Sequence, residues 1–137
     1  MLTKPTYLRI LRASAIYDLV VTAPFATPWT FGVLADLLRQ THERLGLAGI
    51  LPVSDPMHVL FANLMGSVVV IWSIVRLHLG LPVLGRYDAA ARVLFSAWML
   101  YALTGGFSVV IVPILIVEIS FGIGQSLPWR KGIDDTA

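Results

Sequence analysis

Four long apolar stretches run through the chain, separated by short polar or Gly/Pro-rich segments. They cover about residues 8–25, 57–78, 88–104 and 108–127. A helix that crosses a bilayer needs about 20 predominantly apolar residues. The pattern therefore predicts an all-α membrane protein, in which a single domain over residues 1–137 holds four transmembrane helices in an antiparallel bundle.

Residues 29–45 follow a different pattern, which is typical of an amphipathic helix. Leucine and valine recur at helical spacing on one face, whereas Asp36, Arg39 and Glu43 lie on the other. Such a helix is too polar to cross a bilayer and is suited to the membrane surface. We expect an interfacial helix between the first and second spans, and a polar, disordered tail over residues 129–137.

The connections between these segments carry cap and turn signals. Thr27 and Asp55 each precede a proline, which is the pattern of a helix N-cap followed by Pro at the first helical position. Gly80, Pro82 and Gly85 predict a turn between the second and third spans.

The first apolar stretch also has features of a signal peptide, because Lys4, Arg9 and Arg12 precede its apolar run. However, Asp18 interrupts that run, and Pro24 would follow the cleaved bond. We therefore interpret the stretch as a retained membrane helix.

The composition supports a membrane protein and argues against several other classes. Hydrophobic residues make up 57% of the chain and charged residues 13%, against about 25% charged in soluble domains. The chain has no cysteine, and its three histidines lie far apart, so we expect no disulfide, no metal site and no cofactor. The sequence has no phosphate-binding glycine loop and no basic stripe, which argues against nucleic-acid and nucleotide partners.

The lysines and arginines predict the orientation of the helices. Eight of the ten lie near the termini or near the loop between the second and third spans. Only Arg39 and Arg44 lie on the opposite side. Because basic residues are enriched on the cytoplasmic side, we expect a multi-pass protein of the inner (cell) membrane with both termini in the cytoplasm. The interfacial helix is then extracytoplasmic. Arg12, Arg76 and Arg92 are expected to extend toward lipid headgroups.

Two carboxylates within the spans are the strongest candidates for function. Asp18 lies about halfway along the first span and Glu118 near the middle of the fourth. A charge at that depth costs about 2.5–3.5 kcal/mol on insertion scales, so such residues face a bundle interior or a water-filled cavity. If the two faces converge, they form a carboxylate pair. Asp88 and Arg92, one helical turn apart, are expected to form a local ion pair.

Four polar side chains extend the candidate site. Ser14 and Thr22 lie one turn before and one turn after the first carboxylate, Gln125 lies two turns after the second, and Asn63 lies in the second span. We assign this set to ligand binding or proton coupling and assign no catalytic residue. The structural alternative is that the carboxylates are satisfied by neighbouring helices and that Asn63 joins two helices.

The layout resembles that of small bacterial four-helix membrane proteins of the DoxX-like kind. The shared features are short termini, an extracytoplasmic segment after the first span and a tight last hairpin. The resemblance covers architecture only and assigns no role to any residue.

Three functions fit these features. The first is binding or transport of a small cationic or amphipathic molecule in an acidic intramembrane cavity, in exchange for protons and with a homodimer as the transporting form. The second is a non-catalytic subunit or assembly partner of a larger membrane complex. The third is a membrane enzyme that acts on a lipid-soluble substrate, with Asp18 or Glu118 as general acid or base.

Overall fold

The computed structural model describes residues 1–130, which form an all-helical fold. Five α-helices carry it, together with two short 3-10 helices and two short strands. In chain order the elements are β1 (Leu2–Thr3), α1 (Lys4–Thr22), η1 (Ala23–Ala26), α2 (Pro28–Leu45), α3 (Pro56–Leu79), α4 (Pro82–Thr104), η2 (Val109–Ile111), α5 (Val112–Ser126) and β2 (Trp129–Arg130).

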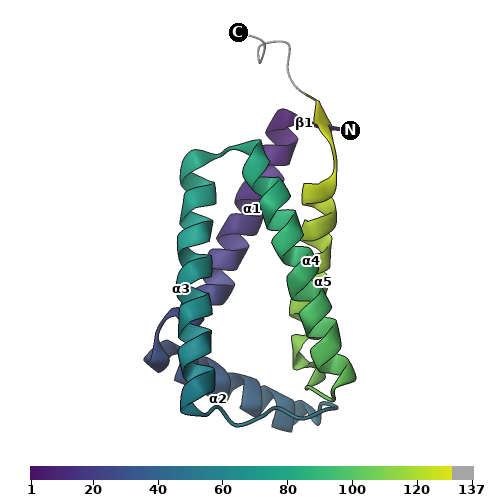
Figure 1. The fold of residues 1–137 in the computed structure, drawn as a ribbon. Coiled ribbons are helices and arrows are strands. Elements are labelled where there is room, and N and C mark those ends of the chain that lie inside the picture. The colour runs from purple at the N-terminus through teal and green to yellow at the C-terminus, as the bar shows by residue number, and fades with distance from the viewer. Residues whose placement is uncertain (131–137) are drawn as a thin grey trace.

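Four long helices run along the molecule and α2 lies across one end of them (Figure 1). α1 packs against α3, α4 packs against α5, and contacts from α1 to α4 and α5 join the two halves. α3 and α4 diverge from their short connection toward α2 (Figure 1). α2 closes that end, because His42 Nδ1 lies 2.7 Å from Ser108 Oγ at the start of η2.

The helices begin where the sequence predicts N-caps. Thr27 Oγ1 accepts the backbone N–H of Thr30 at 3.2 Å, and Asp55 Oδ1 accepts that of His58 at 2.8 Å. Because the ionised carboxylate accepts this backbone hydrogen bond, the pKa of Asp55 is lowered. α3 ends at Gly80, whose φ of 58° is the left-handed conformation that glycine adopts readily.

The third long helix begins earlier than the sequence predicts. Its predicted start was residue 88, but α4 begins at Pro82, so the Gly/Pro segment is mostly helical. Pro82 suits a first helical turn, which has no internal partner for an N–H. Gly85 is needed for packing rather than for a turn, because an added Cβ would lie 3.0 Å from the Tyr7 ring.

The prediction of a disordered tail over residues 129–137 is wrong for its first two residues. Trp129 and Arg130 form β2, which pairs in parallel with β1 in the register Leu2↔Trp129. Leu2 N–H donates to the carbonyl of Pro128 at 2.9 Å, so the two ends of the described chain are held together. The remainder of the predicted tail, 131–137, lies outside the described residues.

The distribution of polar and apolar side chains is the reverse of that in a soluble protein. Within residues 1–130, ten polar or charged residues are buried, against five hydrophobic ones. Large apolar side chains cover the outside: Val20, Val68 and Val93 are each about two-thirds exposed. Because a water-soluble monomer rarely exposes extended apolar surface, this surface indicates a lipid environment.

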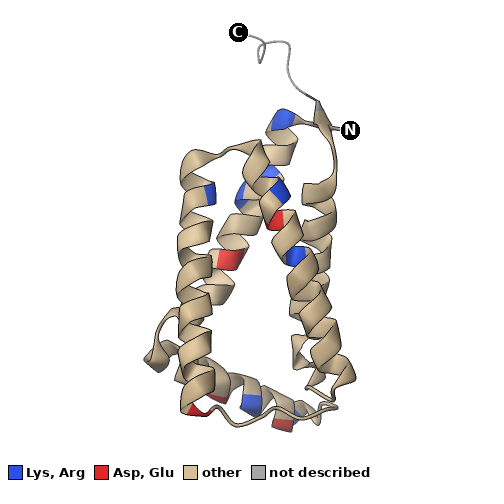
Figure 2. Cartoon of the chain, in the orientation of Figure 1, with Lys and Arg blue, Asp and Glu red and all other residues tan. Residues whose placement is uncertain are grey.

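Within residues 1–130, two of the helical segments are long and apolar enough to cross a membrane. They are α3 and the segment Val109–Ser126, which contains η2 and α5. A third candidate exists if Lys4–Ala26 and Pro28–Leu45 count as one span, although they are bent by 104° relative to each other. α4 is less apolar because it contains Asp88 and Arg92. Figure 2 shows that the charges on the long helices gather toward the end at which β1 and β2 lie.

Candidate functional site

Five charged side chains from four helices meet inside the bundle. They are Asp18 of α1, Arg76 of α3, Asp88 and Arg92 of α4, and Glu118 of α5, and we call them the ion cluster. Arg76 is 0% exposed and Arg92 is 2% exposed, and the three acids are also buried. Burying an ion without a partner is costly, so their pairing determines whether this arrangement is stable.

Arg92 joins all three carboxylates. Its Nη1 donates to Glu118 Oε2 at 2.8 Å, its Nη2 to Asp18 Oδ2 at 2.7 Å, and its Nε to Asp88 Oδ2 at 3.3 Å. The terminal nitrogens of a planar guanidinium are neighbours. The carboxylates of Asp18 and Glu118 therefore lie side by side, each held by the same cation.

Arg76 binds the same cluster from the α3 side. Its Nη2 lies 2.5 Å from Asp18 Oδ2 and its Nη1 lies 2.5 Å from Asp88 Oδ2. Nη2 also donates to Ser73 Oγ at 3.1 Å. The expectation that Arg76 and Arg92 extend to lipid headgroups is therefore wrong, because both side chains turn inward and pair with buried carboxylates.

Neutral side chains complete the hydrogen bonding around Asp88. Gln125 Nε2 donates to Asp88 Oδ2 at 2.7 Å and to Ser14 Oγ at 2.6 Å. Trp72 Nε1 donates to Asp88 Oδ1 at 3.1 Å. Tyr7 of α1 holds α5 in place, because its hydroxyl donates to the backbone carbonyl of Gln125 at 2.8 Å. Asp88 thus has partners for both oxygens.

The charges of the ion cluster do not cancel. Three carboxylates and two guanidinium groups give 2 − 3 = −1 when all five are ionised. A net charge in a low-dielectric interior is unfavourable. One proton or one bound cation would neutralise it.

Asp18 and Glu118 each keep one carboxylate oxygen free of hydrogen bonds within residues 1–130. The arginines contact only Asp18 Oδ2 and Glu118 Oε2. In that part of the chain, Arg76 Nε is the only fully buried side-chain nitrogen or oxygen without a partner. The free oxygens are therefore not sealed inside the protein. Both acids line a cavity of about 210 Å³, so we infer that the oxygens are reached from it.

This cavity lies in the seam where α3 and α4 diverge. Its other walls include Val68, Val69 and Trp72 of α3, and Tyr87, Ala91 and Phe95 of α4. Val68, Tyr87 and Phe95 are also exposed on the outer surface. The cavity therefore combines a charged inner end with apolar and aromatic walls near the surface of the bundle.

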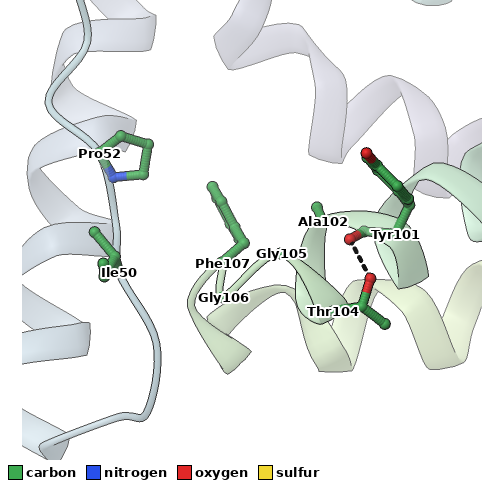
Figure 3. Close-up of a pocket in the computed structure, with 8 residues that line it drawn as sticks. All are labelled: Ile50, Pro52, Tyr101, Ala102, Thr104, Gly105, Gly106 and Phe107. Atoms are coloured by element: carbon green, nitrogen blue, oxygen red, sulfur yellow. Dashed lines mark hydrogen bonds between the residues drawn. The ribbon is translucent and has the colours of Figure 1, made fainter.

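A larger cavity of about 590 Å³ lies near the opposite end of α4. Figure 3 shows Ile50 and Pro52 on one wall and the 101–107 turn on the other. The hydroxyl of Thr104 is already used, since it donates to the Tyr101 carbonyl at 2.7 Å. Among the residues that the structure describes, no charged side chain lines this space, so the smaller cavity is the better candidate site.

The structure brings four of the six predicted site residues together and places two elsewhere. Asp18, Glu118, Ser14 and Gln125 belong to the ion cluster or to its hydrogen-bonding shell. Thr22 Oγ1 instead donates to the carbonyl of Asp18 within α1, at 2.6 Å. Asn63 Nδ2 donates to the carbonyl of Phe25 at 2.7 Å. It therefore joins α3 to η1, as in the structural alternative.

Sequence reasoning missed the role of Arg76, and it treated Arg92 as a local partner of Asp88 or as a side chain that reaches the headgroups. The local pair is confirmed at 3.3 Å, but it is one of four carboxylate or amide contacts that Arg92 makes. The available signal was charge balance, because three acids within apolar helices require nearby cations. No group of His, Asp or Glu side chains within residues 1–130 has the arrangement of a metal site.

Comparison with known proteins adds no further assignment. No family model, no curated protein and no solved structure matches the chain. The candidate function therefore rests on the geometry and charge of these residues.

Proposed function

We propose that this chain is an integral membrane protein that binds a small organic cation in the cavity beside the ion cluster. The observation that carries the proposal is the pair of free carboxylate oxygens, on Asp18 and Glu118, at a cavity whose charged end has a net charge of −1 when all five groups of the ion cluster are ionised. An organic cation supplies both the missing charge and apolar groups for the walls.

The proposal places four helices across the bilayer and α2 along its surface. α1 and α4 are less apolar than α3. Three of their charged residues, Asp18, Asp88 and Arg92, are buried in the bundle, whereas Arg9, Arg12 and Arg86 are exposed. Trp29 and Val33 of α2 are 79% and 72% exposed. An exposed apolar face on an otherwise polar helix is suited to the boundary between headgroups and acyl chains.

The basic residues still support an orientation with both termini in the cytoplasm of an inner-membrane protein. Arg76 and Arg92 are buried, which reduces the eight basic residues on that side to 8 − 2 = 6. The opposite side keeps Arg39 and Arg44. Six basic residues on that side against two on the other still predict the same orientation under the positive-inside rule.

The location and size of the cavity favour a short amphipathic amine. In a lipid bilayer the α3–α4 seam faces acyl chains, so a molecule dissolved in the membrane can enter sideways. A volume of about 210 Å³ corresponds to about seven water molecules at about 30 Å³ each. Transport requires exchange at this site: a proton leaves the cluster when the cation binds and returns when the cation leaves, so the net charge stays compensated.

The other two candidate functions have less support in the structure. A partner subunit was expected to pair the intramembrane acids with its own basic residues, but Arg76 and Arg92 already do so. An enzyme was expected to use Asp18 or Glu118 as a general acid or base, but both carboxylates are already bound by the guanidinium of Arg92.

Filling the cavity is expected to block binding. Ala91 lines it, whereas its neighbour Ala90 is exposed on the outside of α4. We expect Ala91→Trp to weaken binding of radiolabelled n-butylammonium, measured with the purified protein in nanodiscs, by at least about tenfold, because the indole occupies the ligand volume. Ala90→Trp is the matched control and should bind like the unsubstituted chain.

Thermal unfolding of each variant distinguishes loss of the cavity from loss of the fold. If Ala91→Trp unfolds the chain, Ala91→Leu tests the same space with a smaller side chain. Full binding by a folded Ala91 variant would contradict the proposal, and so would failure of the unsubstituted chain to bind n-butylammonium.

A further inference from the structure

The two free carboxylate oxygens impose a requirement on the ligand beyond positive charge. Glu118 has a side chain that is only 8% exposed, and its Oε1 has no donor within residues 1–130. Asp18 Oδ1 likewise has no donor within that range, and its carboxylate is held by the same Arg92. A ligand that displaces water from these oxygens without offering a donor leaves them unsatisfied, which is costly and more so for charged acceptors.

We propose that the ligand is a primary or secondary ammonium whose N–H groups donate to Asp18 Oδ1 and Glu118 Oε1 at the same time. This inference rests on the proposed function and names its substrate class. A primary ammonium has three N–H donors and therefore satisfies both oxygens. A quaternary ammonium carries the same charge without a donor and leaves both oxygens unpaired.

The aromatic walls do not offset that loss for a quaternary ammonium. Stacked aromatic faces can bind such cations, but the guanidinium of Arg76 already lies 6.0 Å from the centre of the Trp72 ring. The Trp72 N–H is also used by Asp88. Tyr87 and Phe95 remain as walls for the apolar part of the ligand.

An inorganic cation fits the site less well than an ammonium. Ca²⁺ takes six to eight oxygen ligands and Mg²⁺ requires near-octahedral coordination. The cluster offers two free carboxylate oxygens, and its remaining carboxylate oxygens already accept from Arg76, Arg92, Trp72 and Gln125. Two acceptors beside an apolar space match two N–H donors on an alkyl chain.

A series of methylated amines tests this requirement at constant charge. The probes are n-butylammonium and its N-methyl, N,N-dimethyl and N,N,N-trimethyl derivatives at pH 7, each measured by equilibrium binding to the full chain in nanodiscs. We expect the first two, which have at least two N–H groups, to bind within about threefold of each other. The trimethyl form is expected to bind at least about tenfold more weakly, with the dimethyl form between them.

If affinity instead rises with the number of methyl groups, the site recognises only charge and apolar area. Each methyl group adds apolar surface, so such a site would bind the trimethyl form at least as tightly as n-butylammonium. That result would overturn the inference and leave the proposed function intact. If none of the four amines binds, the proposed function fails as well.

Discussion

Replacing Arg92 with methionine is expected to lower the free energy of unfolding by about 3–5 kcal/mol, the range for breaking a buried ion pair from one side. The substitution keeps a long apolar stem and removes the guanidinium that bridges Asp18, Asp88 and Glu118. The cluster then carries 1 − 3 = −2 in the bundle interior. Chemical unfolding of the purified protein in mixed micelles measures the loss.

Arg9→Met is the matched control, because it replaces an arginine with methionine at an exposed position of α1. It should alter the free energy of unfolding by less than about 0.5 kcal/mol. Adding Glu118→Gln to Arg92→Met restores a net charge of −1, and part of the lost stability should return. Equal stability of the Arg92 and Arg9 variants would show that the ion cluster does not support the fold.

Glu118→Gln alone is expected to move stability and ligand affinity in opposite directions. The amide oxygen can still accept from Arg92, and the cluster becomes neutral at 2 − 2 = 0. Unfolding should therefore need at least as much free energy as in the unsubstituted chain. Affinity for n-butylammonium should fall by at least about tenfold, because the ligand loses both a charged partner and an acceptor.

The control for this variant is Glu43→Gln on the exposed surface of α2, which should leave affinity unchanged. Binding sites commonly hold groups that cost stability, because the ligand rather than the fold satisfies them. A fall in both stability and affinity would assign Glu118 a purely structural role. An unchanged affinity would remove the acid from the site.

Much of the helical architecture follows from local sequence signals. Apolar length and caps at Thr27 and Asp55 place the helices to within a few residues. The exception is the start of α4, where Gly85 lies within the helix and its missing Cβ leaves room for the Tyr7 side chain. Single-sequence patterns do not report such long-range steric requirements.

The candidate site was only half predictable for a related reason. Asp18 and Glu118 stand out because a carboxylate in an apolar helix is expensive wherever it points. Arg76 does not, because a long arginine near a helix end reaches either the lipid headgroups or the interior at similar apparent cost. Which direction it takes depends on the acids of other helices, and the helix-face pattern of α3 contains no information about them.

Photolabelling with an aminobutyl diazirine tests most directly whether the cavity beside the ion cluster is the ligand site. The labelled protein is digested and the adducts are located by mass spectrometry, with and without excess n-butylammonium. We predict adducts in segments 68–72 of α3 and 87–95 of α4, which n-butylammonium suppresses and Glu118→Gln diminishes. Adducts confined to segments 50–52 and 101–107 at the larger cavity, or labelling that n-butylammonium does not displace, would contradict the account.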